Sequence, residues 1–254
     1  MSGLVTPTMT ETVSGKFIDL AAMKKEDLDI HDIAWSLSRQ SRFGGHTMSK
    51  TPYSVAQHTV MVSRYVEEAL TPGTHLNEVF AKYISSKVSE YAMKGGSDSP
   101  DFVKWVKAQE SLELIHEEMC RTVSFHGLMH DFAEAYLIDL PTPVKRLPGI
   151  YEAYKKFELT LDLLVFETFG LGYGPKQFPE TWAFGSTVVA WADQYALLVE
   201  GYHLMPSRAI EWGIPLPRPS LSSLYSFRWP ISNEAAYLEL IDRFEELRKN
   251  THID

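Results

Sequence analysis

Cysteine is nearly absent from this sequence, since Cys120 is the only one among 254 residues. A single cysteine excludes an intramolecular disulfide and agrees with a reducing compartment. Long apolar runs are also missing, because none approaches the ~18 residues that a membrane-spanning helix requires. The sequence begins without a basic segment followed by an apolar one, so we expect no secretory leader. These absences predict a cytoplasmic protein that makes no use of a membrane.

Basic residues are scarce as well. Lys and Arg number 24 against 33 Asp and Glu, which gives a formal net charge of −9. This balance argues against long nucleic acid as a partner, because nucleic-acid phosphates are bound by clustered cations. A small anionic ligand remains compatible with the composition, provided that local Lys or Arg side chains hold it near a metal cation.

Convincing runs of alternating apolar and polar residues, which would indicate strands, do not occur, whereas helical spacing recurs along the chain. The predicted fold class is therefore all-α, with a helical bundle that forms one domain, 1–254. We expect its core at about 17–70 and 117–204. A helical insertion is expected at 71–115, and a proline-rich C-terminal arm with a final helix at 205–254.

Capping signals predict several helix boundaries. Ser54 and Gln57 form an S-x-x-Q capping box, which predicts a helix that starts at Ser54. Ser186 is expected to cap a later helix. Residues 151–169 carry apolar side chains at helical spacing, on a face that includes Phe157. Residues 1 to about 15 lack periodicity and are expected to form a loose N-terminus.

The most informative stretch contains one imidazole and three carboxylates within ten residues, at His130, Asp131, Glu134 and Asp139. We expect His130 and Asp131 to lie on a helix, where adjacent side chains point about 100° apart. Both can then bind one ion only if other elements complete its shell. Glu134, one turn later, is close enough to bind the metal or polarise a water on it. The stretch therefore predicts a metal site.

Two further ligand candidates lie on other expected helices. His58 falls on the apolar stripe marked by Val55 and Val62, so it points inward. A hydrogen-bonded core histidine is the usual alternative to a metal ligand at such a position. Asp193 follows Val189 by four residues in an apolar segment, so its carboxylate is expected to be buried. A buried charge requires a cation, and a metal or an Arg or Lys partner would serve equally.

The segment Arg42–His46 contains two adjacent glycines between expected helices. Paired glycines permit backbone turns that other residues avoid and allow a ligand to approach closely, so Arg42 could face an anion. An ordinary loop that ends a helix is the alternative. A second His-Asp pair, His31-Asp32, has no acidic residue or histidine at ligand spacing, and we expect it to be a partly exposed pair near a helix start.

Prolines follow the metal stretch. Pro141 and Pro143 are expected to end the helix and to form an extended turn that projects Lys145 and Arg146. These two cations are candidates to hold an anionic ligand.

The ligand candidates occur in the order H…HD…D on successive expected helices. This order resembles that of the HD-domain superfamily of metal-dependent phosphohydrolases. The segments Ser54–His58, His130–Glu134 and Asp139–Lys145 are similar to those of bacterial HD-type 5′-deoxyribonucleotidases and of the related phage dATP triphosphohydrolases. Arg42–His46 resembles the phage-type members. The resemblance covers about residues 17–70 and 117–204.

The resemblance implies a role for each matching residue. The metal ligands would be His58, His130, Asp131 and Asp193. The catalytic residues would be Glu134, which orients or activates the attacking water, and Asp139 in the same polar network. The substrate contacts would be Arg42, Phe43, Lys145 and Arg146. His126, one turn before His130, departs from the pattern, and a structural or substrate-contacting role or a second metal are its alternatives.

These assignments predict a hydrolase that depends on a divalent ion, namely Mn, Co, Zn, Fe or Mg, and that acts on a small-molecule deoxynucleotide. We favour a dNTP (dATP-like) triphosphohydrolase that gives deoxynucleoside and triphosphate. A 5′-deoxyribonucleotidase that acts on dNMPs is the alternative, and a non-catalytic nucleotide-sensing module is an alternative of another class. The expected location is the cytoplasm, or the host cytoplasm if a phage encodes the chain. Homo-oligomer formation stays open.

Overall fold

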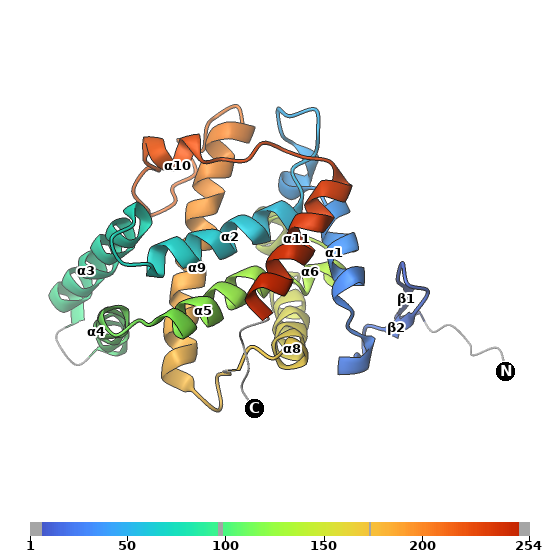
Figure 1. The fold of residues 1–254 in the computed structure, drawn as a ribbon, viewed down its shortest axis with the longest axis horizontal. Helices are drawn as coiled ribbons and strands as arrows, with labels where there is room; N and C mark the ends of the chain where they lie inside the picture. Colours follow the sequence, from blue (N-terminus) through green and yellow to red (C-terminus); the bar gives the residue numbers. More distant parts are fainter. Residues whose placement is uncertain (1–6, 96–98, 173, 249–254) are drawn as a thin grey trace. The chain divides into compact units, whose positions relative to one another are not determined.

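The computed structural model describes residues 7–95, 99–172 and 174–248 (Figure 1). The fold is all-α, as predicted, and its described strands form one antiparallel hairpin near the N-terminus. Part of the segment that was expected to be loose is therefore paired. In chain order the elements are β1 (Met9–Glu11), β2 (Phe17–Asp19), η1 (Lys25–Asp27), α1 (Ile30–Arg39), η2 (Arg42–Gly45), α2 (Val55–Leu70), α3 (His75–Gly95), α4 (Pro100–Glu113), α5 (Glu117–Met129), α6 (Glu134–Leu137), α7 (Thr142–Lys145), α8 (Tyr151–Phe169), α9 (Pro179–Leu204), α10 (Leu221–Tyr225) and α11 (Asn233–Arg248).

The chain divides into two compact units, each built from segments that are distant in sequence. The first unit consists of Met1–Thr59, Met129–Gly170 and Pro230–Arg243, and the second of Val60–Leu128, Leu171–Trp229 and Phe244–Asp254. The expectation of a single domain stays a prediction. Within the described part of the chain, no helix combines the length and the apolar character that crossing a bilayer would require.

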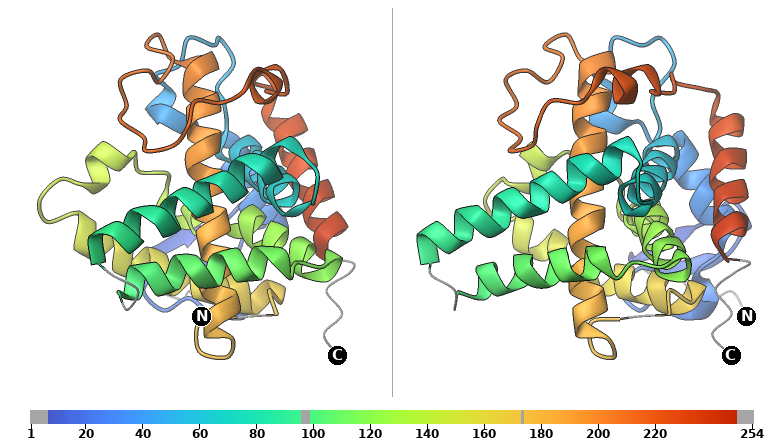
Figure 2. Two further views of the ribbon diagram at one scale, coloured as in Figure 1. Left: turned by 90° about the vertical axis from the view of Figure 1, so that its left-hand side faces the viewer. Right: turned by 60° about the vertical axis from the view of Figure 1, so that its left-hand side comes forward.

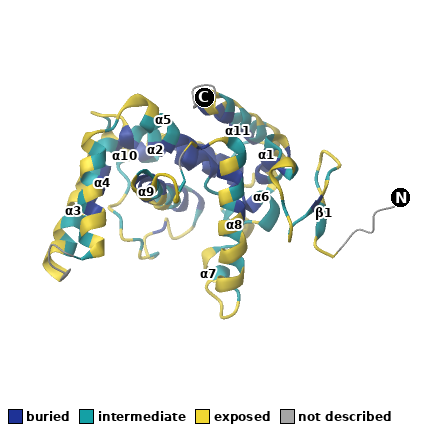
Figure 3. Cartoon of the chain, turned by 90° about the horizontal axis from the view of Figure 1, so that it is seen from below, coloured by how far each residue is buried: buried dark blue, intermediate teal, exposed yellow. Residues whose placement is uncertain are grey.

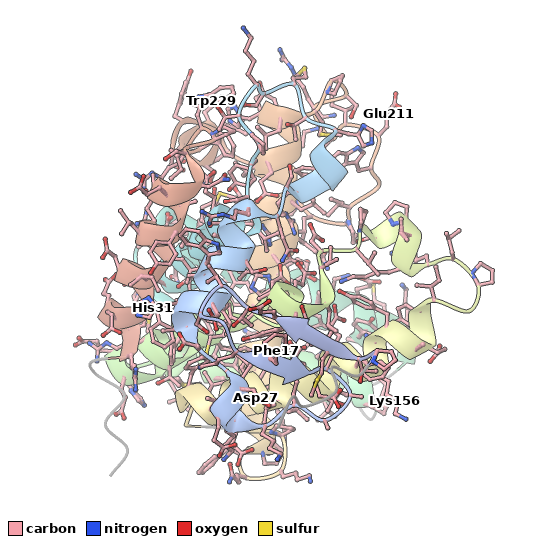
Figure 4. All side chains as sticks on the ribbon, turned by 90° about the vertical axis from the view of Figure 1, so that its right-hand side faces the viewer. Phe17, Asp27, His31, Lys156, Glu211 and Trp229 are labelled. Carbon is pink, nitrogen blue, oxygen red and sulfur yellow. The ribbon has the colours of Figure 1, made fainter. Side chains whose placement is uncertain are left out.

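In the first unit, α1 packs beside α6, and its exposed end contacts the beginning of α11. His31, on α1, has its Nδ1 2.8 Å from the Tyr237 hydroxyl of α11, and Figure 4 labels its position. Its neighbour Asp32 is buried and accepts hydrogen bonds from the backbone N–H and the hydroxyl of Ser14. This second His-Asp pair therefore ties the N-terminal hairpin to α1, which fits the structural role expected for it.

The end of α1 and the start of α2 are joined by a short antiparallel bridge. Ser41 pairs with Ser54, the Arg42 N–H donates to the Tyr53 carbonyl at 2.8 Å, and the Val55 N–H donates to the Gln40 carbonyl at 3.0 Å. The Ser54 hydroxyl then accepts from the Gln57 N–H, as the capping box predicts. This bridge sets the position at which α2 begins and therefore the position of His58 in its first turn.

The second unit contains the predicted helical insertion. α3 and α4 run side by side as a helical hairpin, and α4 also packs against α9 (Figure 2). Ser99 caps α4, and Pro100 occupies its first turn, where a proline is well accommodated. Burial colours show that α3 and α4 expose much of their surface, as does α8 in the first unit (Figure 3). α9, by contrast, is apolar around most of its circumference and buries half of its residues.

His130 and Asp131 do not lie on a helix, contrary to our prediction. α5 ends at Met129, and a tight turn leads into α6. In this turn the Phe132 N–H donates to the Met129 carbonyl and the Glu134 N–H to the Asp131 carbonyl, each at 3.0 Å. Bonds between residues three apart wind the chain more tightly than an α-helix does. The turn therefore sets the directions of the His130 and Asp131 side chains.

Three other local predictions were wrong. α9 begins at Pro179, where proline suits the first helical turn, so Ser186 lies inside the helix. Pro143 lies in the first turn of the one-turn helix α7, where its missing N–H is not needed, so the expected extended turn is absent. Phe157 is 54% exposed. The buried apolar residues of α8 are Leu161, Val165 and Phe166.

Candidate metal centre

Three of the four predicted metal ligands lie together in the first unit. His58, His130 and Asp131 each offer a ligand atom, and these atoms all lie within 4.8 Å of one another. Nε2 of His58 is 3.6 Å from Oδ2 of Asp131, and Nε2 of His130 is 3.2 Å from the same oxygen. The two imidazole rings have centroids 5.3 Å apart. The structure thus contains a possible metal-binding triad.

The helix start and the turn described above position this triad. His58 lies in the first turn of α2 and is completely buried, as its place on the apolar stripe predicts. His130 and Asp131 approach it from the turn after α5, where the neighbouring residues Met129 and Phe132 are fully buried. The donor atoms therefore come from two elements that are both anchored in the core.

The chemistry of these donors fits a divalent transition ion. Two imidazoles and one carboxylate form a mixed nitrogen and oxygen set, which leaves coordination positions open. Burial raises the pKa of the Asp131 carboxyl. The charge and hydrogen bond of His130, with the charges of His58 and Arg42, outweigh this effect and hold the pKa below its usual range. Asp131 is therefore an anion, as a metal ligand must be.

Two more acids border the triad. Glu134 is only 3% exposed, and its Oε2 has no hydrogen-bond partner among the described residues. Burial, followed by the charges of Asp131 and Asp139, raises the pKa of Glu134 to about 9. Burial also raises the pKa of Asp139, although the charge of Arg42 opposes it. The two predicted catalytic acids thus lie in the electrostatic field of the triad, as perturbed groups at functional sites commonly do.

The predicted substrate contact Arg42 also borders the triad. Its Nη1 is 3.8 Å from Oδ2 of Asp131, and its guanidinium lies over the ring of Phe43 at 5.8 Å from the centroid. Phe43 has a left-handed backbone (φ 58°), as has Gly44 beside it. A Cβ at Gly44 would lie 3.9 Å from Pro141, so the turn packs close to the segment after Asp139. That the glycine pair lets a ligand approach closely stays a prediction.

Lys145 is engaged by two acids. Its Nζ lies 3.3 Å from Oε1 of Glu134 and 2.8 Å from Oε1 of Glu158, and it also stacks over the Tyr154 ring at 4.7 Å. Burial lowers the pKa of Lys145, but the hydrogen bond with Glu158 and the charge of Glu134 outweigh this and raise it. Arg146, the neighbouring predicted contact, is exposed.

The inner face of α8 carries two acids, Glu158 and Asp162, that were not predicted as site residues. Asp162 follows Glu158 by one turn, and its Oδ1 is buried without a hydrogen-bond partner among the described residues. Burial, then the charges of Glu158 and Asp131, raises its pKa well above the usual range. The sequence does contain a signal for this face, because at helical spacing two acids share it with apolar residues, which indicates that the acids are buried. The positions on that face are Tyr154, Glu158, Leu161, Asp162 and Val165.

Two predicted residues belong to the second unit. Asp193 lies on α9 and is half-buried, and its role as a fourth ligand stays a prediction. His126 lies on α5 and is buried, with its ring stacked on Trp182 at a centroid distance of 4.9 Å. This stacking favours the structural alternative for His126. Among the described residues, the triad is the sole group of three or more potential metal ligands, so nothing indicates a second metal there.

No model of a known protein family matches the chain. The chain is similar to a protein of Escherichia coli (strain K12) named "Uncharacterized protein YfdR", with 28% identity over 237 residues. These residues make up 93% of this chain and 94% of the relative, so the likeness extends over almost the whole of both proteins. The name of the relative states no activity, and the function is therefore argued from the site.

Proposed function

We propose that this protein is a metal-dependent phosphohydrolase that acts on deoxynucleotides, as its resemblance to HD-domain enzymes implies. The observation that carries the proposal is the convergence of His58, His130 and Asp131 within 4.8 Å. Two buried acids and two cations border this triad, which is the set of groups that cleavage of a phosphate ester requires.

The donor set favours Mn, Co, Fe or Zn over Mg, because imidazole nitrogen suits transition ions and Mg prefers oxygen ligands. His58, His130 and Asp131 would hold the ion, and Asp193 stays the fourth ligand that the resemblance implies. When bound, such an ion supplies a Lewis acid that polarises a phosphoryl oxygen and lowers the pKa of water.

The acids of the site handle the proton. We assign Glu134 to take up the proton of the attacking water, since its carboxyl is buried beside the triad and the positive charge of a bound ion would favour its ionised form. Asp139 belongs to the same polar network and orients the water or the sugar. The reaction breaks one phosphorus–oxygen bond and forms another with the water oxygen, and the proton passes to the leaving group or to solvent.

The cations hold the phosphate. Arg42 lies at the triad, and Lys145 lies against Glu134, so both can neutralise charge that grows on the phosphoryl oxygens. Our first candidate substrate is a dNTP such as dATP, which would give deoxynucleoside and triphosphate. A dNMP is the second candidate, and one observation supports it. Lys145 is already paired with Glu134 and Glu158, and Arg146 is exposed, so the site has little positive charge to bind a triphosphate.

A panel of dNMPs and dNTPs with Mn²⁺ or Co²⁺ tests the proposal by the identity of the products. Triphosphate from dATP supports the first candidate, whereas inorganic phosphate from dNMPs alone supports the second. EDTA should abolish either activity. Glu134→Ala should abolish turnover and keep metal binding. If the wild-type protein shows no turnover with any substrate of the panel, and Glu134→Ala binds the nucleotide as the wild type does, the protein is instead a sensing module.

A further inference from the structure

The peptide group between Ile138 and Asp139 is held by side chains from two separate segments of the chain. The N–H of Asp139 donates to Oε1 of Gln40, which follows α1 directly, at 2.9 Å. The carbonyl oxygen of Ile138 accepts from the hydroxyl of Tyr154, on α8, at 2.8 Å. Both polar ends of this peptide group are therefore fixed by side chains, which leaves it no freedom to rotate without losing a hydrogen bond.

This peptide group follows a strained residue. Ile138 has φ 68° and ψ 142°, a left-handed conformation that a β-branched residue rarely adopts. Its side chain is 64% exposed, so burial of the isoleucine does not compensate for the strain. The hydrogen bonds of Gln40 and Tyr154, together with the one that the Ile138 N–H donates to the Glu134 carbonyl at 2.8 Å, thus hold the chain in this conformation.

Gln40 also contacts the other candidate catalytic acid. Its Nε2 donates to the carbonyl oxygen of Glu134 at 2.9 Å, while its Oε1 accepts from the Asp139 N–H. One side-chain amide thereby joins the backbones of both acids. Nε2 also donates to Ser36, whose hydroxyl donates to the Ala135 carbonyl at 2.8 Å. The α6 segment is therefore tied to α1 at several points.

We propose that Gln40 and Tyr154 are positioning residues, which hold the Ile138–Asp139 peptide in its strained conformation and so aim the Asp139 carboxyl into the site at a fixed separation from Glu134. The expected effect of this positioning on turnover rests on the proposed function, whereas its effect on the orientation of the Asp139 carboxyl does not. Strain is retained at functional sites where the surrounding structure fixes it, and small errors of placement lower rates by about 100-fold.

Gln40→Met and Tyr154→Phe remove the two hydrogen bonds and keep the size of each side chain. Each should lower kcat by 10-fold to 100-fold with little change of KM, because the metal ligands and the cations stay in place. The matched controls are Arg39→Met, beside Gln40, and Tyr151→Phe, an exposed tyrosine on α8. Both controls should keep the wild-type kcat, and equal losses in controls and test variants would overturn the proposal.

Gln40→Glu separates positioning from general destabilisation. Its carboxylate still accepts from the Asp139 N–H, but it can donate to the Glu134 carbonyl only when it is protonated. Its defect in kcat relative to wild type should therefore shrink as the pH falls, whereas the defect of Gln40→Met should not. A pH-independent defect of Gln40→Glu would contradict the assignment.

The titration of the Asp139 carboxyl carbon, followed by NMR and assigned with Asp139→Asn, needs no turnover. Because burial raises the pKa of Asp139, release of the carboxyl to solvent in Gln40→Met or Tyr154→Phe should lower it, and the controls should leave it unchanged. That result in a protein without turnover would remove the proposed function and keep the positioning role. Normal turnover and an unchanged Asp139 titration in both variants would refute the positioning role and leave the proposed function in place.

Discussion

Lys145 is paired with Glu158, with 2.8 Å between Nζ and Oε1, although its expected role is to bind phosphate. Glu158 lies on the inner face of α8, and both side chains are about three-quarters buried. A pair with this degree of burial interacts more strongly than a pair on the surface, because water screens it less. A phosphate that reaches Lys145 must therefore compete with Glu158.

Glu158→Gln should strengthen substrate binding. The amide keeps the size of the side chain and removes the competing negative charge, so KM for the deoxynucleotide should fall about 3-fold to 10-fold, which corresponds to about 0.7 to 1.4 kcal/mol. Steady-state kinetics of the variant measure this change. Glu152→Gln, an exposed change on the same helix, is the control and should leave KM as it is. A higher KM in Glu158→Gln would mean that Glu158 holds Lys145 in its binding position.

His130→Ala should weaken metal binding, because it removes one of the three converging donors. We expect the affinity for Mn²⁺ or Co²⁺, measured by calorimetry, to fall by at least roughly 100-fold, since even partners of metal ligands contribute about 10-fold to 100-fold. His31→Ala is a matched control, because His31 also precedes an aspartate but binds Tyr237. Equal affinities in the two variants would rule out the triad as the metal site.

Glu134→Gln should stabilise the metal-free protein at neutral and alkaline pH. Burial, with the charges of Asp131 and Asp139, raises the pKa of Glu134 to about 9 from 4.5. Between these values the folded state binds one proton more than the unfolded state, so this group lowers stability as the pH rises. The neutral amide removes that loss.

Urea unfolding at several pH values in EDTA measures the effect. The gain in the free energy of unfolding should be near zero below pH 4.5, grow with pH, and reach on the order of 5 kcal/mol at pH 8. Glu118→Gln, an exposed change on α5, should give no such trend. A gain that does not vary with pH would show that Glu134 is ionised in the folded protein.

Gly201→Ala should destabilise the fold. A Cβ at Gly201, on α9, would lie 2.7 Å from the Cβ of Ala209 and 2.7 Å from the ring of Trp212. Such overpacking costs about 1 to 3 kcal/mol, which thermal unfolding can measure. Gly174→Ala is the control, because its nearest new contact would be 3.7 Å away. An unchanged midpoint in Gly201→Ala would mean that the segment carrying Trp212 shifts freely.

Local signals in the sequence were sufficient for much of the fold. A capping box and helical spacing predicted α2 and α8 and placed a final helix, α11, within 205–254, because apolar residues recur at helical spacing in each. These local signals were misleading at the turn that carries His130 and Asp131, which was expected to be helical, and at a proline that lies in the first turn of a helix. Pro143, for example, was expected to end a helix and to form an extended turn, but it lies in the first turn of α7, where a proline's missing N–H is harmless.

The sequence by itself determined the donor types of the site and the inward direction of His58, since both follow from residue identity and helical spacing. Only the tertiary structure decided that His130 and Asp131 lie in a turn that brings them to His58. It also decided that Glu158 faces Lys145 and that Gln40 joins Glu134 to Asp139. These contacts connect residues from separate elements, and the packing between those elements, which no local pattern encodes, sets their distances.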